Sequence, residues 1–131
     1  MLKIGKKGCF ETTVTESNTA AAMKSGSLPV FATPALAAAM EAASIACIEG
    51  DLEEGTTTVG TSLALKHISA TPVGMQVTAE AELLQINGRK LLFKVTAFDG
   101  AGVIGEAKHE RIIVQIERFL AKTKEKRRME C

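Results

Sequence analysis

The chain contains no tryptophan and no tyrosine, and its five phenylalanines are scattered along 131 residues. Proteins that bind single-stranded nucleic acids stack the bases on aromatic side chains, so the sequence offers no such platform. Neither sign of charge dominates, because 16 lysines and arginines oppose 15 aspartates and glutamates for a formal net charge of +1. This balance argues against general attraction to nucleic acids or membrane surfaces, and we expect neither as a partner.

Cysteine is also sparse. Cys9, Cys47 and Cys131 are odd in number and lack the spacing of metal ligands. The sequence has no glycine-rich phosphate loop and no nucleotide-binding fingerprint. We therefore expect no metal and no cofactor. No apolar run is long enough for a signal peptide or a membrane span, and together with the unpaired cysteines this predicts a cytoplasmic protein.

What the chain does have is the composition of a globular protein, with 46% hydrophobic residues, and a length that fits a single domain, residues 1–131. An apolar segment begins at Pro34 and ends before Gly50. Proline favours the first helical position, glycine the position just past the end, and Thr33 has a side chain suited to an N-cap. These signals predict a helix over residues 34–50. It is apolar on every face, which is typical of a buried helix.

The other segments have a hydrophobic period of two, which indicates strands. Strands are expected over residues 8–15, 56–68, 75–83 and 103–116, with one more between the Asn87-Gly88 and Asp99-Gly100 turns. Residues 16–30 form a loop or lid with a helical turn around residues 19–24, and residues 117–131 form a polar tail with a short helix. The order predicts the α+β class, with a five-stranded antiparallel sheet wrapped around one long buried helix.

The alternation also predicts which side chains face the helix. In three strands they are Val59, Thr61, Leu63, Leu65 and His67; Met75, Val77, Ala79, Ala81 and Leu83; and Leu91, Phe93, Val95 and Ala97. In the last strand the apolar parity slips between Gly105 and Arg111, which predicts a bulge or a change of face there.

Glu41 lies in the middle of the apolar helix. A buried ionised carboxylate costs several kcal/mol, on the order of 3–5, unless it is paired or protonated. Two interpretations follow: a core glutamate satisfied by a buried lysine, arginine or backbone group, or a catalytic acid, base or nucleophile. His67 is placed on an apolar strand face, where it is either a core histidine or an acid–base group. Thr33 by itself is most simply a helix cap.

Several strings, in order and spacing, resemble the hot-dog-fold thioesterases of the fluoroacetyl-CoA thioesterase family. They are Phe31-Ala-Thr-Pro34 with Met40-Glu41, Gly60-Thr61, His67-Ile-Ser-Ala-Thr71-Pro-Val-Gly74, Asn87-Gly-Arg-Lys-Leu-Leu-Phe93, Ala97-Phe-Asp-Gly100 and Ile104-Gly-Glu-Ala-Lys-His109-Glu-Arg111. The resemblance implies a hot-dog fold and hydrolysis of an acyl-CoA, with coenzyme A as part of the substrate. It implies a catalytic set of Thr33, Glu41 and His67, with Gly60 and Arg111 near the acyl group. It also implies a homodimer with active sites at the interface.

The chain departs from this family in the lid. Residues 23–30 contain no aromatic side chain, whereas the fluoroacetyl-specific enzyme has a longer, aromatic-rich segment. We therefore expect thioester hydrolysis without strong selection for fluoroacetyl. Thr33 and Glu41 are roughly 12 Å apart along one helix, so either they act on different ends of the acyl group or a second subunit brings them together. The alternatives are a non-catalytic acyl-thioester binding module and a hot-dog hydratase or dehydratase, which usually carries an Asp/His pair that this helix lacks.

Overall fold

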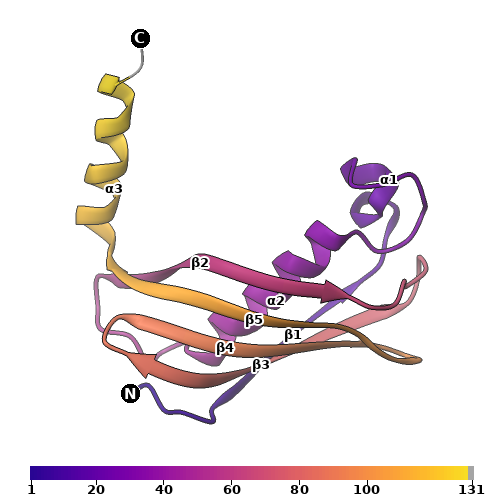
Figure 1. Cartoon of the computed structure of the whole chain (residues 1–131), viewed down its shortest axis with the longest axis horizontal. Coiled ribbons are helices and arrows are strands. Elements are labelled where there is room, and N and C mark those ends of the chain that lie inside the picture. The colour runs from indigo at the N-terminus through magenta and orange to yellow at the C-terminus, as the bar shows by residue number, and fades with distance from the viewer. Residues whose placement is uncertain (130–131) are drawn as a thin grey trace.

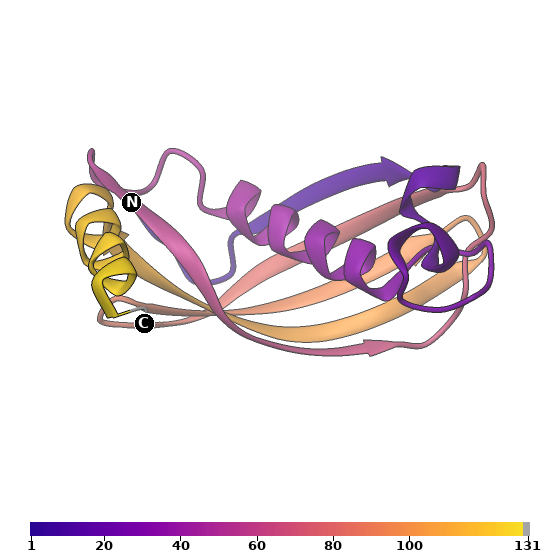
Figure 2. The same cartoon turned by 90° about the horizontal axis from the view of Figure 1, so that it is seen from above.

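The computed structural model describes residues 1–129 and shows an antiparallel sheet that curves around one long helix (Figures 1 and 2). The strands are β1 (Lys7–Thr13), β2 (Thr56–His67), β3 (Gln76–Asn87), β4 (Lys90–Asp99) and β5 (Gly102–Gln115). The helices are α1 (Ala20–Met23), α2 (Thr33–Cys47) and α3 (Ile116–Lys124), with short 3-10 turns at η1 (Glu16–Asn18) and η2 (Glu125–Met129). The predicted α+β class is confirmed.

The five strands are hydrogen-bonded in the order β1-β3-β4-β5-β2, and every pair is antiparallel. β1 and β2 are therefore the edges of the sheet. The core lies between α2 and the concave face, where the alternation predicted for β3 and β4 is confirmed. Its buried members include Val77, Ala79, Ala81, Leu83, Leu91, Phe93, Val95 and Ala97.

The backbone of β1 lies close to α2 because Gly8 has no side chain. A Cβ at Gly8 would lie 2.3 Å from the backbone nitrogen of Cys47 and 2.8 Å from the carbonyl oxygen of Ala43. The thiol of Cys47 is fully buried and donates to the carbonyl oxygen of Lys6 at 3.0 Å. The end of α2 is thus held directly against the first strand.

The prediction that α2 is buried on every face is wrong for the single chain. The sheet covers the face that carries Leu36, Met40 and Ala43, each fully buried. The opposite face is open: Ile45 is 48% exposed and the side chain of Glu41 is 43% exposed. One curved sheet wraps around only part of a helix, so an apolar sequence on all faces leaves one apolar face uncovered.

The tail has the predicted helix, which stands away from the sheet as α3, at the end opposite α1 (Figure 1). Residues 130 and 131 of the predicted tail, including Cys131, lie outside the described residues. Within residues 1–129 no helix is both long and apolar enough to span a bilayer.

Candidate active site

Thr33 and His67 form the first polar pair. Thr33 is the first residue of α2 and His67 the last of β2, and Thr33 Oγ1 lies 2.7 Å from His67 Nδ1. The prediction that Thr33 caps the helix is wrong, because Ala32 occupies the N-cap and no side chain caps the first turn. The Thr33 hydroxyl oxygen instead contacts the histidine ring.

The surroundings of the His67 ring indicate which of its two nitrogens carries the hydrogen. Nε2 is buried and has no hydrogen-bond partner among the described residues. A buried N–H without an acceptor is rarer and more costly than a buried nitrogen lone pair. We therefore assign the hydrogen to Nδ1, which donates to Thr33 Oγ1 and leaves the hydroxyl hydrogen of Thr33 free to donate elsewhere. Burial lowers the pKa of His67 below the ordinary 6.5, although the nearby backbone of Ser69 opposes the shift.

A pocket of about 260 Å³ opens at this pair. Its lining combines both members of the pair with the lid and the segment after β2: Ala20, Ser25, Val30, Phe31, Thr33, His67, Ile68, Ser69 and Ala70. A larger pocket of about 640 Å³ lies beside the C-terminal half of α2 and includes none of Thr33, Glu41 and His67. The Thr33–His67 pair therefore opens into the smaller pocket.

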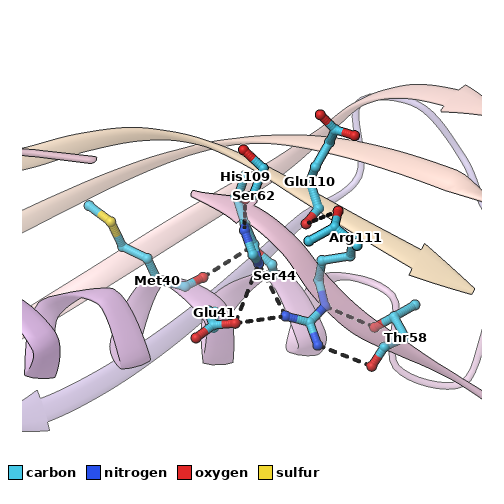
Figure 3. A network of polar contacts seen from close by, with 9 residues as sticks. Met40, Glu41, Ser44, Thr58, Ser62, His109, Glu110 and Arg111 are labelled. Carbon is cyan, nitrogen blue, oxygen red and sulfur yellow. Dashed lines mark hydrogen bonds and ion pairs between the residues drawn. The ribbon is translucent and has the colours of Figure 1, made fainter. Parts of the chain in front are cut away.

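Glu41 and Arg111 form the second polar group, further along α2 (Figure 3). Arg111 Nη1 donates to Glu41 Oε2 at 3.2 Å, and His109 Nε2 lies 3.9 Å from the same oxygen. The carboxylate is thus paired with an arginine, as one interpretation of the sequence required, but it is half exposed rather than buried. A paired carboxylate that solvent can reach is able to contact a substrate or a water molecule.

The guanidinium of Arg111 is fixed from its other side by Thr58. Nε donates to Thr58 Oγ1 at 2.9 Å and Nη2 donates to the Thr58 carbonyl oxygen at 3.1 Å. Arg111 is buried, and burial lowers its pKa while the charge and the hydrogen bond of Glu41 raise it. Thr58 and Arg111 are on the paired strands β2 and β5, so the backbone itself sets where the guanidinium lies.

Gly60 packs directly against this group. A Cβ at Gly60 would lie 2.7 Å from Glu41 Oε2, 3.2 Å from His109 Cε1 and 3.3 Å from Arg111 Nη1. Gly60 faces α2 because the register of β2 against β5 shifts between Gly60 and Ser62. The predicted inner face of β2 is therefore wrong before the shift, where Thr58 and Gly60 take the positions assigned to Val59 and Thr61.

The break in apolar alternation between Gly105 and Arg111 does not come from a change of face within that segment. Gly105, Ala107, His109 and Arg111 are all buried on one face of β5, so the face does not change between Gly105 and Arg111. The register shift against β4 lies just before, where Ile104 is left unpaired. The apolar pattern slips because two of the inward positions carry polar side chains, His109 and Arg111.

The structure therefore joins the five predicted site residues into two groups. One is Thr33 with His67, and the other is Glu41 with Gly60 and Arg111. Within one chain the groups stay apart, because Thr33 and Glu41 are separated by roughly 12 Å of helix. Two further residues of the second group, Thr58 and His109, were not predicted as site residues. One signal for His109 was present in the sequence: it lies two residues before Arg111 and so shares the same face of the strand. No cluster of three or more potential metal ligands occurs within residues 1–129.

Comparison with known proteins shows the family to which the chain is similar. A family model described as fluoroacetyl-CoA-specific thioesterase matches residues 14–117. A fluoroacetyl-CoA thioesterase from Streptantibioticus cattleyicolor is 40% identical over 97 residues, which are 74% of this chain and 70% of that protein.

Solved structures are similar over nearly the whole chain. A crystal structure of a fluoroacetyl-CoA thioesterase superposes with a TM-score of 0.90 at 32% identity, covering 96% of this chain and 98% of the other. A hypothetical protein of Thermus thermophilus, described as a member of the thioesterase superfamily, has a TM-score of 0.89 at 28% identity and covers 99% and 98%. The hot-dog fold predicted from the sequence is confirmed.

Proposed function

The chain belongs to the fluoroacetyl-CoA-specific thioesterase family, and on that premise we propose that it hydrolyses a small acyl-CoA to the free acid and coenzyme A. The observation that carries the proposal for this chain is the 2.7 Å contact between Thr33 and His67 at a pocket of about 260 Å³. This contact places a hydroxyl donor at the mouth of a small cavity.

Thr33 supplies the hydrogen bond that the reaction needs at the carbonyl oxygen. Attack on a thioester develops negative charge on that oxygen, and a fixed donor stabilises it. With Nδ1–H of His67 donating to Thr33 Oγ1, the hydroxyl hydrogen points away from the ring and is available to the substrate. His67 is then required in its neutral form.

Glu41 supplies the base. A water molecule forms the new bond to the carbonyl carbon, its proton passes to the carboxylate, and the carbon–sulfur bond breaks. The proton then leaves Glu41 for the thiolate of coenzyme A, which completes the balance. Arg111 fixes one carboxylate oxygen, Oε2, at 3.2 Å, and the absence of a side chain at Gly60 lets that oxygen lie directly against β2, since a Cβ there would be 2.7 Å from it.

We propose that two copies of the chain form each active site, because the two groups lie apart within one chain. β2 is an edge strand of the sheet. Its unpaired backbone N–H and C=O groups can hydrogen-bond to the same strand of a second copy. A two-fold axis between Leu63 and Ala64 sets Gly60 of one copy opposite His67 of the other. It would bring the Thr33–His67 pair to the Glu41–Gly60–Arg111 group of the second copy. The same arrangement gives the open apolar face of α2, with Ile45, a partner to pack against.

The proposed substrate also fits a cytoplasmic protein, since acyl-CoA thioesters are intracellular metabolites. Cys9 is exposed and free, which suits a reducing compartment.

The test is release of free thiol from acetyl-, fluoroacetyl- and short acyl-CoAs by the purified chain. We expect turnover by the wild type and a loss of about 10²- to 10⁴-fold in Glu41→Gln, the usual effect of removing a general base. Glu106→Gln is the matched control, because Glu106 is exposed on the outer face of β5. No thiol release from any acyl-CoA would favour a binding module, and a fully active Glu41→Gln variant would remove Glu41 from the mechanism.

A further inference from the structure

We propose that His109 is a positioning residue of this site: as a neutral imidazole with its hydrogen on Nδ1, it holds the Arg111 guanidinium against Glu41. The inference rests on the proposed function, because Arg111 and Glu41 belong to the active site proposed there. His109 does not contact the substrate in this account; it acts through Arg111.

The neighbours of the ring determine where its hydrogen lies. His109 is 1% exposed, and its Nδ1 is 2.8 Å from the carbonyl oxygen of Ser62 while its Nε2 is 3.1 Å from Arg111 Nη1 (Figure 3). A carbonyl oxygen only accepts and a guanidinium only donates. Both contacts are hydrogen bonds only if Nδ1 carries the hydrogen and Nε2 is a lone pair. This tautomer is neutral.

A charged ring does not fit the same place. A hydrogen on Nε2 would point at a nitrogen that has no lone pair to accept it, and would set a second positive charge beside Arg111. Burial lowers the pKa of His109 and the charge of Arg111 lowers it further, whereas the Ser62 backbone and Glu41 act in the opposite direction. The charged groups that face the ring are Arg111 on its own strand and Glu41 on α2.

The acceptor atom, Nε2 of His109, matters because it binds Nη1 of Arg111, the nitrogen that also binds Glu41. Nε and Nη2 of Arg111 are satisfied by Thr58, whereas Nη1 is the nitrogen that reaches Glu41, and His109 is its other acceptor. Without His109 a buried N–H of Nη1 loses its partner, and Glu41 is the only acceptor that still holds this nitrogen in place. The Cβ site of Gly60 is 3.3 Å from Nη1 and 2.7 Å from Glu41 Oε2, so a shift of this nitrogen would change how Glu41 packs against β2.

The sharpest test uses two amides. In His109→Gln the amide oxygen can take the place of Nε2 and accept from Arg111, whereas in His109→Asn the shorter amide replaces only Nδ1 and its bond to Ser62. A buried hydrogen bond to a charged group is typically worth about tenfold to a hundredfold in an equilibrium or rate. We expect kcat with acetyl-CoA to fall by that factor in His109→Asn and by less than about tenfold in His109→Gln. Equal losses in the two variants, with equal melting temperatures, would overturn the proposal.

A second measurement does not depend on activity. Nitrogen-15 NMR of the wild-type imidazole rings at pH 7 should show His109 as the neutral tautomer with hydrogen on Nδ1, identified by loss of its signals in His109→Gln. A charged ring, or hydrogen on Nε2, would overturn the proposal whatever the kinetics show. A wild type that has this tautomer but cleaves no thioester would instead refute the proposed function.

Discussion

At the scale of single residues, the protonation of His67 controls whether Thr33 can work. The proposed Thr33 donor requires a neutral ring, with one hydrogen on Nδ1 and none on the buried Nε2. Burial opposes protonation in the same sense, since it lowers the pKa of His67 below 6.5. The neutral, aligned ring is therefore the dominant form at neutral pH.

This predicts the direction of the pH dependence. Turnover should be level above pH 6.5 and fall as the pH drops below it, because His67 becomes charged only below its ordinary pKa. The measurement is kcat with saturating acetyl-CoA between pH 5 and 8, with His67→Gln as the variant that should lose the His67 contribution. Level kinetics over the whole range, or a fall that begins above pH 7, would contradict this role.

How far single residues could be predicted differs between Glu41 and its surroundings. Glu41 was identified because a carboxylate is unusual in an apolar helix, and this interruption of pattern is visible in any sequence. The expected burial was wrong, because the sequence does not say how much of a helix one sheet can cover. Thr58 was missed as a site residue because its role comes from a contact between strands, which depends on register, whereas the alternation that places His109 on the same face as Arg111 was visible in the sequence.

At the scale of elements, the close approach of β1 and α2 requires a residue without a side chain. Gly8 is the contact point, where a Cβ would lie 2.3 Å from the Cys47 nitrogen. We expect Gly8→Ala to destabilise the fold by about 1–3 kcal/mol, as in other cases of overpacking, because both neighbours are backbone and cannot turn aside. Urea unfolding measures this. Gly100→Ala is the control, since its Cβ would meet only the end of Met75 at 3.9 Å, and equal midpoints for both variants would refute the contact.

The lid is the element that bears on substrate selection. It consists of η1, α1 and the segment up to Val30, contains no aromatic residue, and has Met23 and Leu28 at 42% and 63% exposure. Small differences in an apolar pocket are worth about 1–3 kcal/mol. We therefore expect kcat/KM for fluoroacetyl-CoA to exceed that for acetyl-CoA by less than about a hundredfold. A preference of many thousandfold would show that discrimination lies elsewhere, in the surroundings of Thr33, Gly60 and Arg111.

The elements themselves were largely predictable, since regular alternation identified β3 and β4 with their inward residues. The register shift after Gly60 was not, because a period of two cannot show where one extra residue is inserted. That single residue decides that Gly60 rather than Thr61 faces Glu41. The sequence thus predicted the layers of the fold better than the faces near the site.

At the scale of the whole molecule, two observations favour pairing of two copies. β2 is an unpaired edge, and the open face of α2 carries exposed Ile45 beside half-exposed Glu41. Pairing through β2 would cover both and would join the two polar groups that one chain keeps apart. Light scattering at micromolar concentration should show a dimer, and an active monomer would refute the shared site.

The most direct test of the shared site is to mix two inactive variants. Thr33→Ala removes the donor of one group and Glu41→Gln the base of the other, so each variant alone should be nearly inactive. If each site takes Thr33 from one copy and Glu41 from the other, a mixed dimer contains one native site and one doubly altered site. After equal amounts are unfolded and refolded together, random pairing should restore about a quarter of wild-type thiol release. If both groups act within one chain, no mixed dimer has a native site, and the mixture would stay as inactive as its components.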